Sequence, residues 1–198
     1  MSSVDEVVDA LEAGELVVIP TDTVYGLACL PDSETAVRAL SALKRRPREQ
    51  PIALVGASVE ALRKLVPELS ERTVLPGPFT VVVPNPERCL PWLTGSRPDT
   101  IGVRVPDVAG AASELLGCVG VVAATSANLH GGRDPRRLDD VPAEILAGAS
   151  AVLDGGELPG TASTVIDLTG PEPVVLREGA VPADEALRRM SGSRLLAQ

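Results

Sequence analysis

The chain has 198 residues, of which 44% are hydrophobic and 23% are charged, a composition typical of a globular protein with a sizeable core. Only three residues are aromatic, Tyr25, Phe79 and Trp92, which excludes a row of exposed rings for stacking on single-stranded nucleic acid. The net charge of −9 argues against a broad surface for nucleic acid or an anionic membrane, although it is compatible with a local basic pocket. Because the core must be built from Val, Leu, Ala and Ile, we expect β-branched strands covered by Ala- and Leu-rich helices.

The N-terminus and the cysteines predict a cytoplasmic protein. The first residues carry neither a basic start nor an apolar segment typical of a signal peptide, and no apolar run reaches the ~20 residues of a membrane span. Cys29, Cys89 and Cys118 are odd in number and far apart, and His130 is the single histidine, which disfavours a zinc site and a disulfide framework. We therefore expect reduced cysteines, no resident metal ion and no membrane association.

In the first part of the chain, helical spacing of apolar residues alternates with short apolar runs. Ser3 and Glu6 form a capping box at the start of a helix that Gly14 ends, and Pro67 closes another helix. The all-apolar run before Pro20 is typical of a strand that is buried on both faces, and a loop follows it. The predicted elements are a helix at 4–11, a strand at 16–19, a helix at 36–43, a strand at 52–55 and a helix at 59–66.

The second part continues the same alternation. We expect Asp107 to cap a helix, and the last residues, 195–198, to be frayed. The predicted elements are strands at 79–83 and 101–105, a helix at 107–116, a strand at 119–123, a helix at 138–146, strands at 151–153, 165–168 and 174–176, and a helix at 183–190. No internal repeat and no long linker divides them, so we predict a single α/β (α+β) domain with a mixed sheet.

Polar motifs follow the apolar strands, at the place where open α/β sheets form ligand crevices. In Pro20–Gly26, which reads PTDTVYG, hydroxyls and a carboxylate either satisfy turn amides or form a wall for a small polar ligand. The basic cluster KRRPR at 44–48 either complements a helix C-terminus and a solvated face or offers a stiff cationic turn for a polyphosphate. The sequence contains neither GxxxxGK[ST] nor GxGxxG, so it predicts neither a P-loop nor a Rossmann phosphate site.

Three further features could hold anions. The turn TSAN at 125–128 carries Ser and Asn side chains that can bind a phosphate or a carboxylate, but Ser126 lies outside a GxSxG elbow, which disfavours a nucleophilic triad. Arg104 lies within an apolar strand, where a charge needs an anionic partner: either an Asp or Glu of this protein or the carboxylate of a ligand. The run TAST at 161–164 precedes another strand, and Arg177 follows one.

Taken in order, seven motifs resemble the YrdC-like family of threonylcarbamoyl-adenylate synthases. They are PTDTVYGL (20–27), KRRP with QPI (44–52), PGPFTVVVP (76–84), IGVRVP (101–106), TSAN (125–128), STVIDL (163–168) and LREGAV (176–181). The resemblance runs from about residue 14 to residue 181 and implies one domain over 1–198 with its core at 4–190. It also implies the family's fold, a twisted mixed β-sheet that is flanked by helices around a central cavity.

The resemblance implies a nucleotidyltransferase that condenses L-threonine, bicarbonate and ATP to threonylcarbamoyl-adenylate and pyrophosphate. ATP would be a substrate, and Mg²⁺ would accompany it through its phosphates. A separate threonylcarbamoyl transferase complex would use the product to make N6-threonylcarbamoyladenosine in tRNA, so any contact of this chain with tRNA would be indirect or weak. Positioning and neutralisation of charge by cations, rather than a covalent nucleophile, is the expected mechanism.

By position, the resemblance also assigns site residues. Those around the nucleotide and the carbamate, which we expect to be catalytic, are Lys44, Arg46, Ser126 and Asn128. Those that would hold the threonine are Thr23, Arg104 and Ser163. Those that would line the ATP site are Arg46, Gln50, Thr100, Ser126, Asp134 and Arg177.

The sequence departs from the family in places, and other functions compete with the synthase. Val55 stands where many relatives carry a histidine near the threonine, and Gln50 and His130 also differ from common family residues. One alternative is a YrdC- or YciO-like paralogue that binds double-stranded RNA or tRNA without synthase activity, which the acidic charge and the few aromatic residues disfavour. Another is a carbamoyl-adenylate activity like that of YrdC-like domains within larger carbamoyltransferases.

Overall fold

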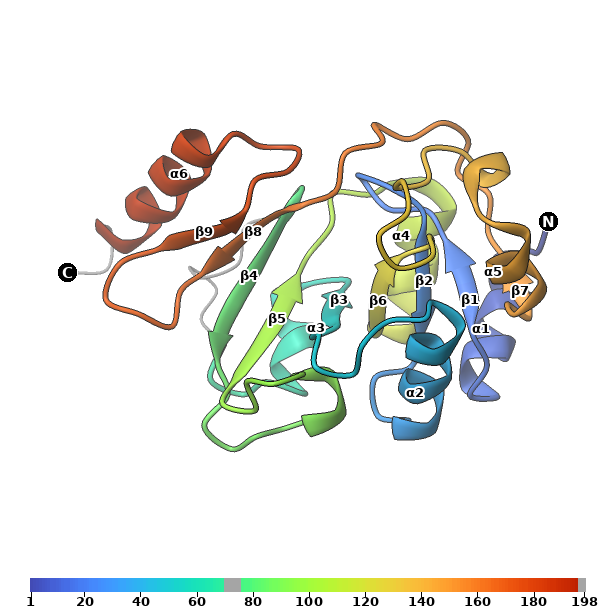
Figure 1. Cartoon of the computed structure of the whole chain (residues 1–198), viewed down its shortest axis with the longest axis horizontal. Coiled ribbons are helices and arrows are strands. Elements are labelled where there is room, and N and C mark those ends of the chain that lie inside the picture. The colour runs from blue at the N-terminus through green and yellow to red at the C-terminus, as the bar shows by residue number, and fades with distance from the viewer. Residues whose placement is uncertain (70–75, 196–198) are drawn as a thin grey trace.

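Nine strands form one mixed sheet in the computed structural model of the chain, which describes residues 1–69 and 76–195 (Figure 1). They are β1 (Val17–Ile19), β2 (Gly26–Cys29), β3 (Ala53–Gly56), β4 (Phe79–Pro84), β5 (Thr100–Arg104), β6 (Val121–Ser126), β7 (Ala151–Val152), β8 (Thr164–Asp167) and β9 (Val174–Arg177). Across the sheet their order is β7-β1-β2-β6-β3-β5-β4-β8-β9. Three of the neighbouring pairs, β1 with β7, β3 with β5 and β4 with β8, are parallel and the other five are antiparallel. The predicted mixed α/β fold is confirmed.

Three of the helices begin at serine caps. Ser3, Ser33 and Ser58 each accept a hydrogen bond from a backbone N–H of the first turn, and Ser3 forms the predicted capping box with Glu6. The helices are α1 (Val4–Glu12), α2 (Glu34–Leu43), α3 (Val59–Arg63), α4 (Gly110–Val119), α5 (Ala143–Ala147) and α6 (Ala183–Leu195), with short 3₁₀ turns η1 (Pro91–Leu93) and η2 (Leu138–Asp140). In the described part of the chain, no helix is both long and apolar enough to cross a membrane.

Alternation along the strands divides the apolar residues into two clusters, one on each face of the sheet. On β1, Val18 belongs to the larger cluster, which includes residues of α2, α3, α5 and α6. Its neighbours Val17 and Ile19 belong to the smaller cluster, to which α1 and α4 contribute. Helices α1 and α4 pack against each other on that second face, close to β1 and β6.

Three helix predictions need correction. The helix expected at 138–146 is interrupted, because Val141 and Pro142 are extended, and η2 and α5 lie on either side of them. The helix expected at 59–66 ends at Arg63. The predicted cap at Asp107 is wrong: α4 begins at Gly110, and the backbone N–H of Asp107 donates to the distant Asp22 carboxylate at 3.1 Å.

One strand escaped prediction. The run Gly26–Cys29 was expected in a loop, yet it is β2, fully buried between β1 and β6. Its four apolar residues form a short run like those of the other buried strands, but the polar motif that precedes them favoured the interpretation as a loop. At the other end of the chain α6 includes Leu195, the first residue of the expected frayed end, and 196–198 lie outside the described residues.

Candidate active site

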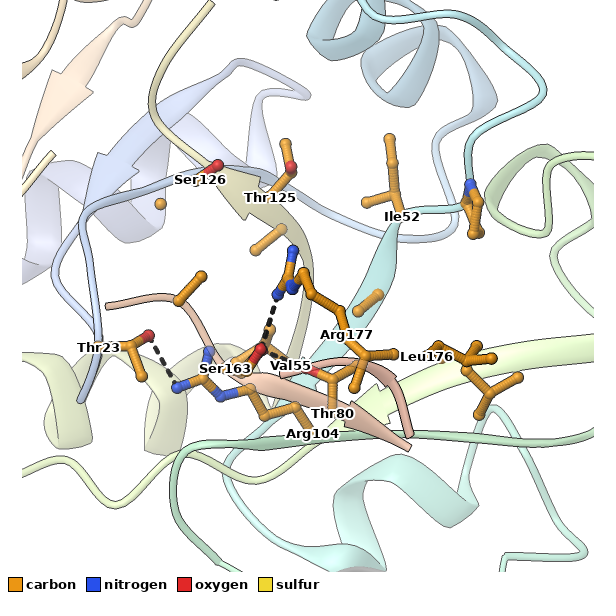
Figure 2. A pocket seen from close by; sticks show the side chains of 18 of the residues that line it. Thr23, Ile52, Val55, Thr80, Arg104, Thr125, Ser126, Ser163, Leu176 and Arg177 are labelled. Atoms are coloured by element: carbon orange, nitrogen blue, oxygen red, sulfur yellow. Dashed lines mark hydrogen bonds between the residues drawn. The ribbon is translucent and has the colours of Figure 1, made fainter. Parts of the chain in front are cut away.

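The cavity lies on the face of the central strands that is opposite the larger apolar cluster. On β5, Ile101 and Val103 belong to that cluster, whereas Thr100, Gly102 and Arg104 line the cavity. Strands β3 and β4 alternate in the same way, so three neighbouring strands present small or polar side chains on one side. The volume of the cavity is about 370 Å³. Figure 2 shows side chains of residues that line it.

The wall of this cavity is rich in cations and hydroxyls. Six threonines, three serines and four arginines line it, and none of its described lining residues is an aspartate or a glutamate. The polar lining residues are Thr21, Thr23, Thr80, Thr94, Thr100, Thr125, Ser96, Ser126, Ser163, Arg46, Arg97, Arg104 and Arg177. Such a wall suits an anionic ligand that makes many hydrogen bonds.

Arg104, the last residue of β5, is held at one end of the cavity by the PTDTVYG loop. Its side chain is only 8% exposed, and its Nη2 donates to Asp22 Oδ1 and, at 3.0 Å, to Thr23 Oγ1. The buried Nε has no hydrogen-bond partner among the described residues. Burial lowers the pKa of Arg104, and Asp22 opposes that effect. Of the two partners that the sequence left open, the structure thus supplies Asp22.

Arg177 reaches across the middle of the cavity (Figure 2). Its Nη2 donates to the backbone oxygen of Ser163 at 2.8 Å, and the Ser163 hydroxyl lies 2.8 Å from that of Thr80. Arg46 enters from the loop after α2 and donates to the carbonyl of Pro51 at 2.8 Å, while its buried Nε has no partner among the described residues. Burial and the nearby Arg177 both lower the pKa of Arg46.

Lys44 lies behind the wall rather than in it. Its side chain is buried, and its ammonium donates to the backbone oxygens of Ser126 and Asn128 and, at 2.8 Å, to Asn128 Oδ1. The same amide oxygen accepts from the Ser126 hydroxyl at 2.7 Å. Burial, with a contribution from Arg46, lowers the pKa of Lys44 to about 8. Lys44 therefore stabilises the turn that carries Ser126 through these hydrogen bonds.

The structure gathers most of the predicted site residues, but not all, around the cavity. Those in the wall are Thr23, Arg46, Thr100, Arg104, Ser126, Ser163 and Arg177. Lys44, Asn128 and Asp134 form a hydrogen-bonded cluster next to it, in which Asn128 Nδ2 donates to Asp134 Oδ1 at 3.3 Å. Gln50 lines a separate hollow between α2 and η1, with its amide nitrogen 3.5 Å from His130 Nε2.

Other lining residues were not predicted. Thr80 could have been found, because it occupies the position of β4 that alternates with the core residues Phe79 and Val81. Arg97 carries no local signal, since it lies in a loop and reaches the cavity only through the fold. Within the described residues there is no group of three or more His, Cys, Asp or Glu side chains that could hold a metal ion.

Fold and wall together define a mixed α/β domain whose internal cavity is suited to a small polyanion. The sequence profile of the Sua5/YciO/YrdC family, described as telomere recombination, matches residues 9–179, and the chain belongs to this family. The family resemblance drawn from the sequence motifs is thus confirmed.

Relatives with assigned names share its sequence over most of the chain. The threonylcarbamoyl-AMP synthase of Yersinia enterocolitica is 38% identical over 170 residues, which cover 79% of this chain and 87% of the relative. That of Pyrococcus abyssi is 36% identical over 182 residues, 88% of this chain. The chain spans only 53% of that Pyrococcus relative.

Solved structures agree with this membership. The structure of P. abyssi Sua5 complexed with L-threonine matches with a TM-score of 0.85 at 34% identity, covering 94% of this chain and 56% of the other. Escherichia coli YciO matches with a TM-score of 0.74 at 24% identity, which demonstrates a shared fold.

Proposed function

We propose that the protein is a nucleotidyltransferase that condenses L-threonine, bicarbonate and ATP to threonylcarbamoyl-adenylate and pyrophosphate. The observation that carries this proposal is the wall of the cavity, which offers four arginines and no carboxylate among its described residues. The names of its relatives and the L-threonine bound to P. abyssi Sua5 support the choice of reaction. The product would pass to a separate transferase that modifies tRNA.

The end of the cavity near Arg104 suits an amino acid. Nη1 of Arg104 donates to none of the described residues and, unlike the buried Nε, is not shut off from the cavity, so it can donate to a substrate carboxylate. The hydroxyls of Thr23, Ser163 and Thr80 lie beside this guanidinium and are small enough to leave room for a threonine side chain (Figure 2).

The opposite end suits the triphosphate. Arg46 and Arg177 carry no carboxylate partner among the described residues, so each can neutralise phosphate oxygens. The adenine would rest on the aliphatic side chains of Val82, Val165 and Leu176, because none of the described lining residues is aromatic. Mg²⁺ would arrive with ATP, held by phosphates and water, since the wall contributes no carboxylate to it.

The mechanism needs positioning more than covalent catalysis. The neutral amine of threonine attacks the carbon of bicarbonate, the C–O bond breaks, and water leaves to give the carbamate. A carbamate oxygen then attacks the α-phosphorus of ATP, and the bond to the β-phosphate breaks to release pyrophosphate. Both steps bring anions together, so the arginines would lower the barrier by neutralising the charge that accumulates.

The test is a product assay with the purified protein. ATP, magnesium and labelled bicarbonate are incubated with and without L-threonine, and both pyrophosphate and labelled adenylate are measured. We expect both products to depend on threonine, and Glu144→Gln, which changes an exposed ion pair with Arg45 outside the cavity, to retain them. Absence of a threonine-dependent product under conditions in which a known synthase is active would refute the proposal.

A further inference from the structure

Asp22 lies next to the cavity without being part of its wall. Its side chain is 9% exposed, and each carboxylate oxygen is already engaged. Oδ1 accepts from Arg104 Nη2, and Oδ2 accepts from the backbone N–H of Asp107 at 3.1 Å. The carboxylate therefore cannot turn toward a ligand without breaking one of these bonds.

The loop that carries Asp22 is preorganised by its own hydrogen bonds. Thr21 Oγ1 accepts from the backbone N–H groups of Thr23 and Val24 at 3.2 and 3.3 Å, and donates to the carbonyl of Val24 at 2.8 Å. This turn places the Asp22 carboxylate and the Thr23 hydroxyl on the same Nη2 of Arg104. The guanidinium is thereby fixed before any ligand binds.

The charges along the cavity are consequently uneven. Arg177 lies close enough to both Arg104 and Arg46 to contribute to the lowered pKa of each. Within the described part of the chain, Asp22 is the one carboxylate that pairs with any of these three arginines. One end of the cavity is therefore a neutral ion pair, and the other end keeps its full positive charge.

We propose that Asp22 is a specificity-determining residue that reserves the Arg104 end of the cavity for an amino acid and excludes phosphate from it. An amino-acid zwitterion brings no net charge to the neutral Asp22–Arg104 pair. Its carboxylate needs only the Arg104 N–H groups that Asp22 and Thr23 do not use. A phosphate dianion at the same place would be repelled by Asp22 and would instead bind at Arg46 and Arg177. The proposal rests on the proposed function for the identity of the amino acid, but not for the exclusion of phosphate.

The test uses the isosteric variant Asp22→Asn, which removes the charge and keeps an oxygen for the Asp107 N–H. Binding of L-threonine is measured by calorimetry in sodium chloride and in sodium phosphate of equal ionic strength. In the wild type, and in the matched charge control Glu144→Gln, we expect phosphate to change the threonine Kd less than about twofold. In Asp22→Asn we expect phosphate to raise the threonine Kd by about tenfold or more. The repulsion that Asp22 exerts on a phosphate a few ångströms away is larger than the free energy that corresponds to a tenfold change in Kd.

Two further variants separate charge from structure. Asp22→Glu retains the charge and should exclude phosphate as the wild type does. The double variant Asp22→Asn/Arg104→Gln lacks the arginine that Asp22→Asn leaves unpaired. Phosphate should therefore no longer compete with threonine in it. Equal phosphate sensitivity of Asp22→Asn and wild type would overturn the proposal, even if the affinity for threonine had fallen.

Titration of each variant with phosphate in the absence of threonine tests the exclusion of phosphate separately from the proposed function. If the wild type binds no threonine, the proposed function fails, yet Asp22→Asn must still gain a phosphate-binding event that wild type and the double variant lack. If Asp22→Asn is unfolded in chloride, folding in millimolar phosphate that the double variant does not show supports the proposal. A chain that stays unfolded in phosphate overturns it, because the freed arginine then accepts no phosphate.

Discussion

Lys44 is buried as a cation, and this makes the stability of the protein depend on pH in a way that one substitution should abolish. Its pKa is lowered to about 8 in the folded chain from an ordinary value of 10.5, mainly by burial. Between these two values the unfolded chain binds more protons than the folded one, so the free energy of unfolding rises as pH increases from about 8 to 10.5.

The expected size of the effect follows from the same values. The lowering of the Lys44 pKa from 10.5 to about 8 means that the charged side chain reduces the free energy of unfolding by about 3 kcal/mol at neutral pH. Raising the pH from 7 to 9 should restore about 1 kcal/mol of it. Above pH 9 the ionisation of Cys29 opposes this trend, because burial raises the pKa of that thiol to about 12 and only the unfolded chain then ionises it readily.

The perturbation is Lys44→Met, which keeps an unbranched chain of similar length and removes the titrating group. Urea unfolding of both proteins at pH 7 and pH 9 gives two free-energy differences, and subtracting them cancels every group that the variants share. The wild type should gain about 1 kcal/mol more than Lys44→Met between the two pH values. An equal gain in both proteins would refute the inference that burial lowers the pKa of Lys44 in the folded chain.

Three other outcomes follow from particular contacts. Arg104→Lys keeps the charge beside Asp22 but loses the Nη1 donor that the described residues leave unused, so steady-state kinetics should give a KM for threonine raised by about tenfold or more with the KM for ATP unchanged. Tyr25→Phe removes a buried hydroxyl 2.6 Å from Asp154 Oδ1, and urea unfolding should register a loss of about 1–3 kcal/mol while the KM for threonine stays as in the wild type. Gly95→Ala should destabilise the fold by more than about 1 kcal/mol in thermal unfolding, because φ is +61° there and a Cβ would lie 2.2 Å from the Glu49 carbonyl; a melting temperature equal to the wild type's would contradict this.

Local signals in the sequence were sufficient for most elements. The Ser3 capping box and apolar spacing located α1, apolar spacing located α2, and short apolar runs before prolines located β1 and β4. Local signals failed where neighbours in the chain competed or where a distant group intervened. Pro142 divided a segment of helical periodicity. The backbone N–H of Asp107 donates to the distant Asp22, and α4 begins three residues later, at Gly110.

The sequence by itself also indicated several of the polar residues that line the cavity, because polar motifs after strands and an arginine inside an apolar strand are visible without coordinates. Only the tertiary structure decided how they are arranged: Arg104 and Asp22 are 82 residues apart, yet they form a buried ion pair. Lys44 and Ser126 are equally far apart in the chain, yet the Lys44 ammonium donates to the backbone oxygen of Ser126. These contacts depend on the order of the strands, and a one-residue change of register would turn each side chain to the other face of the sheet, which no local pattern encodes.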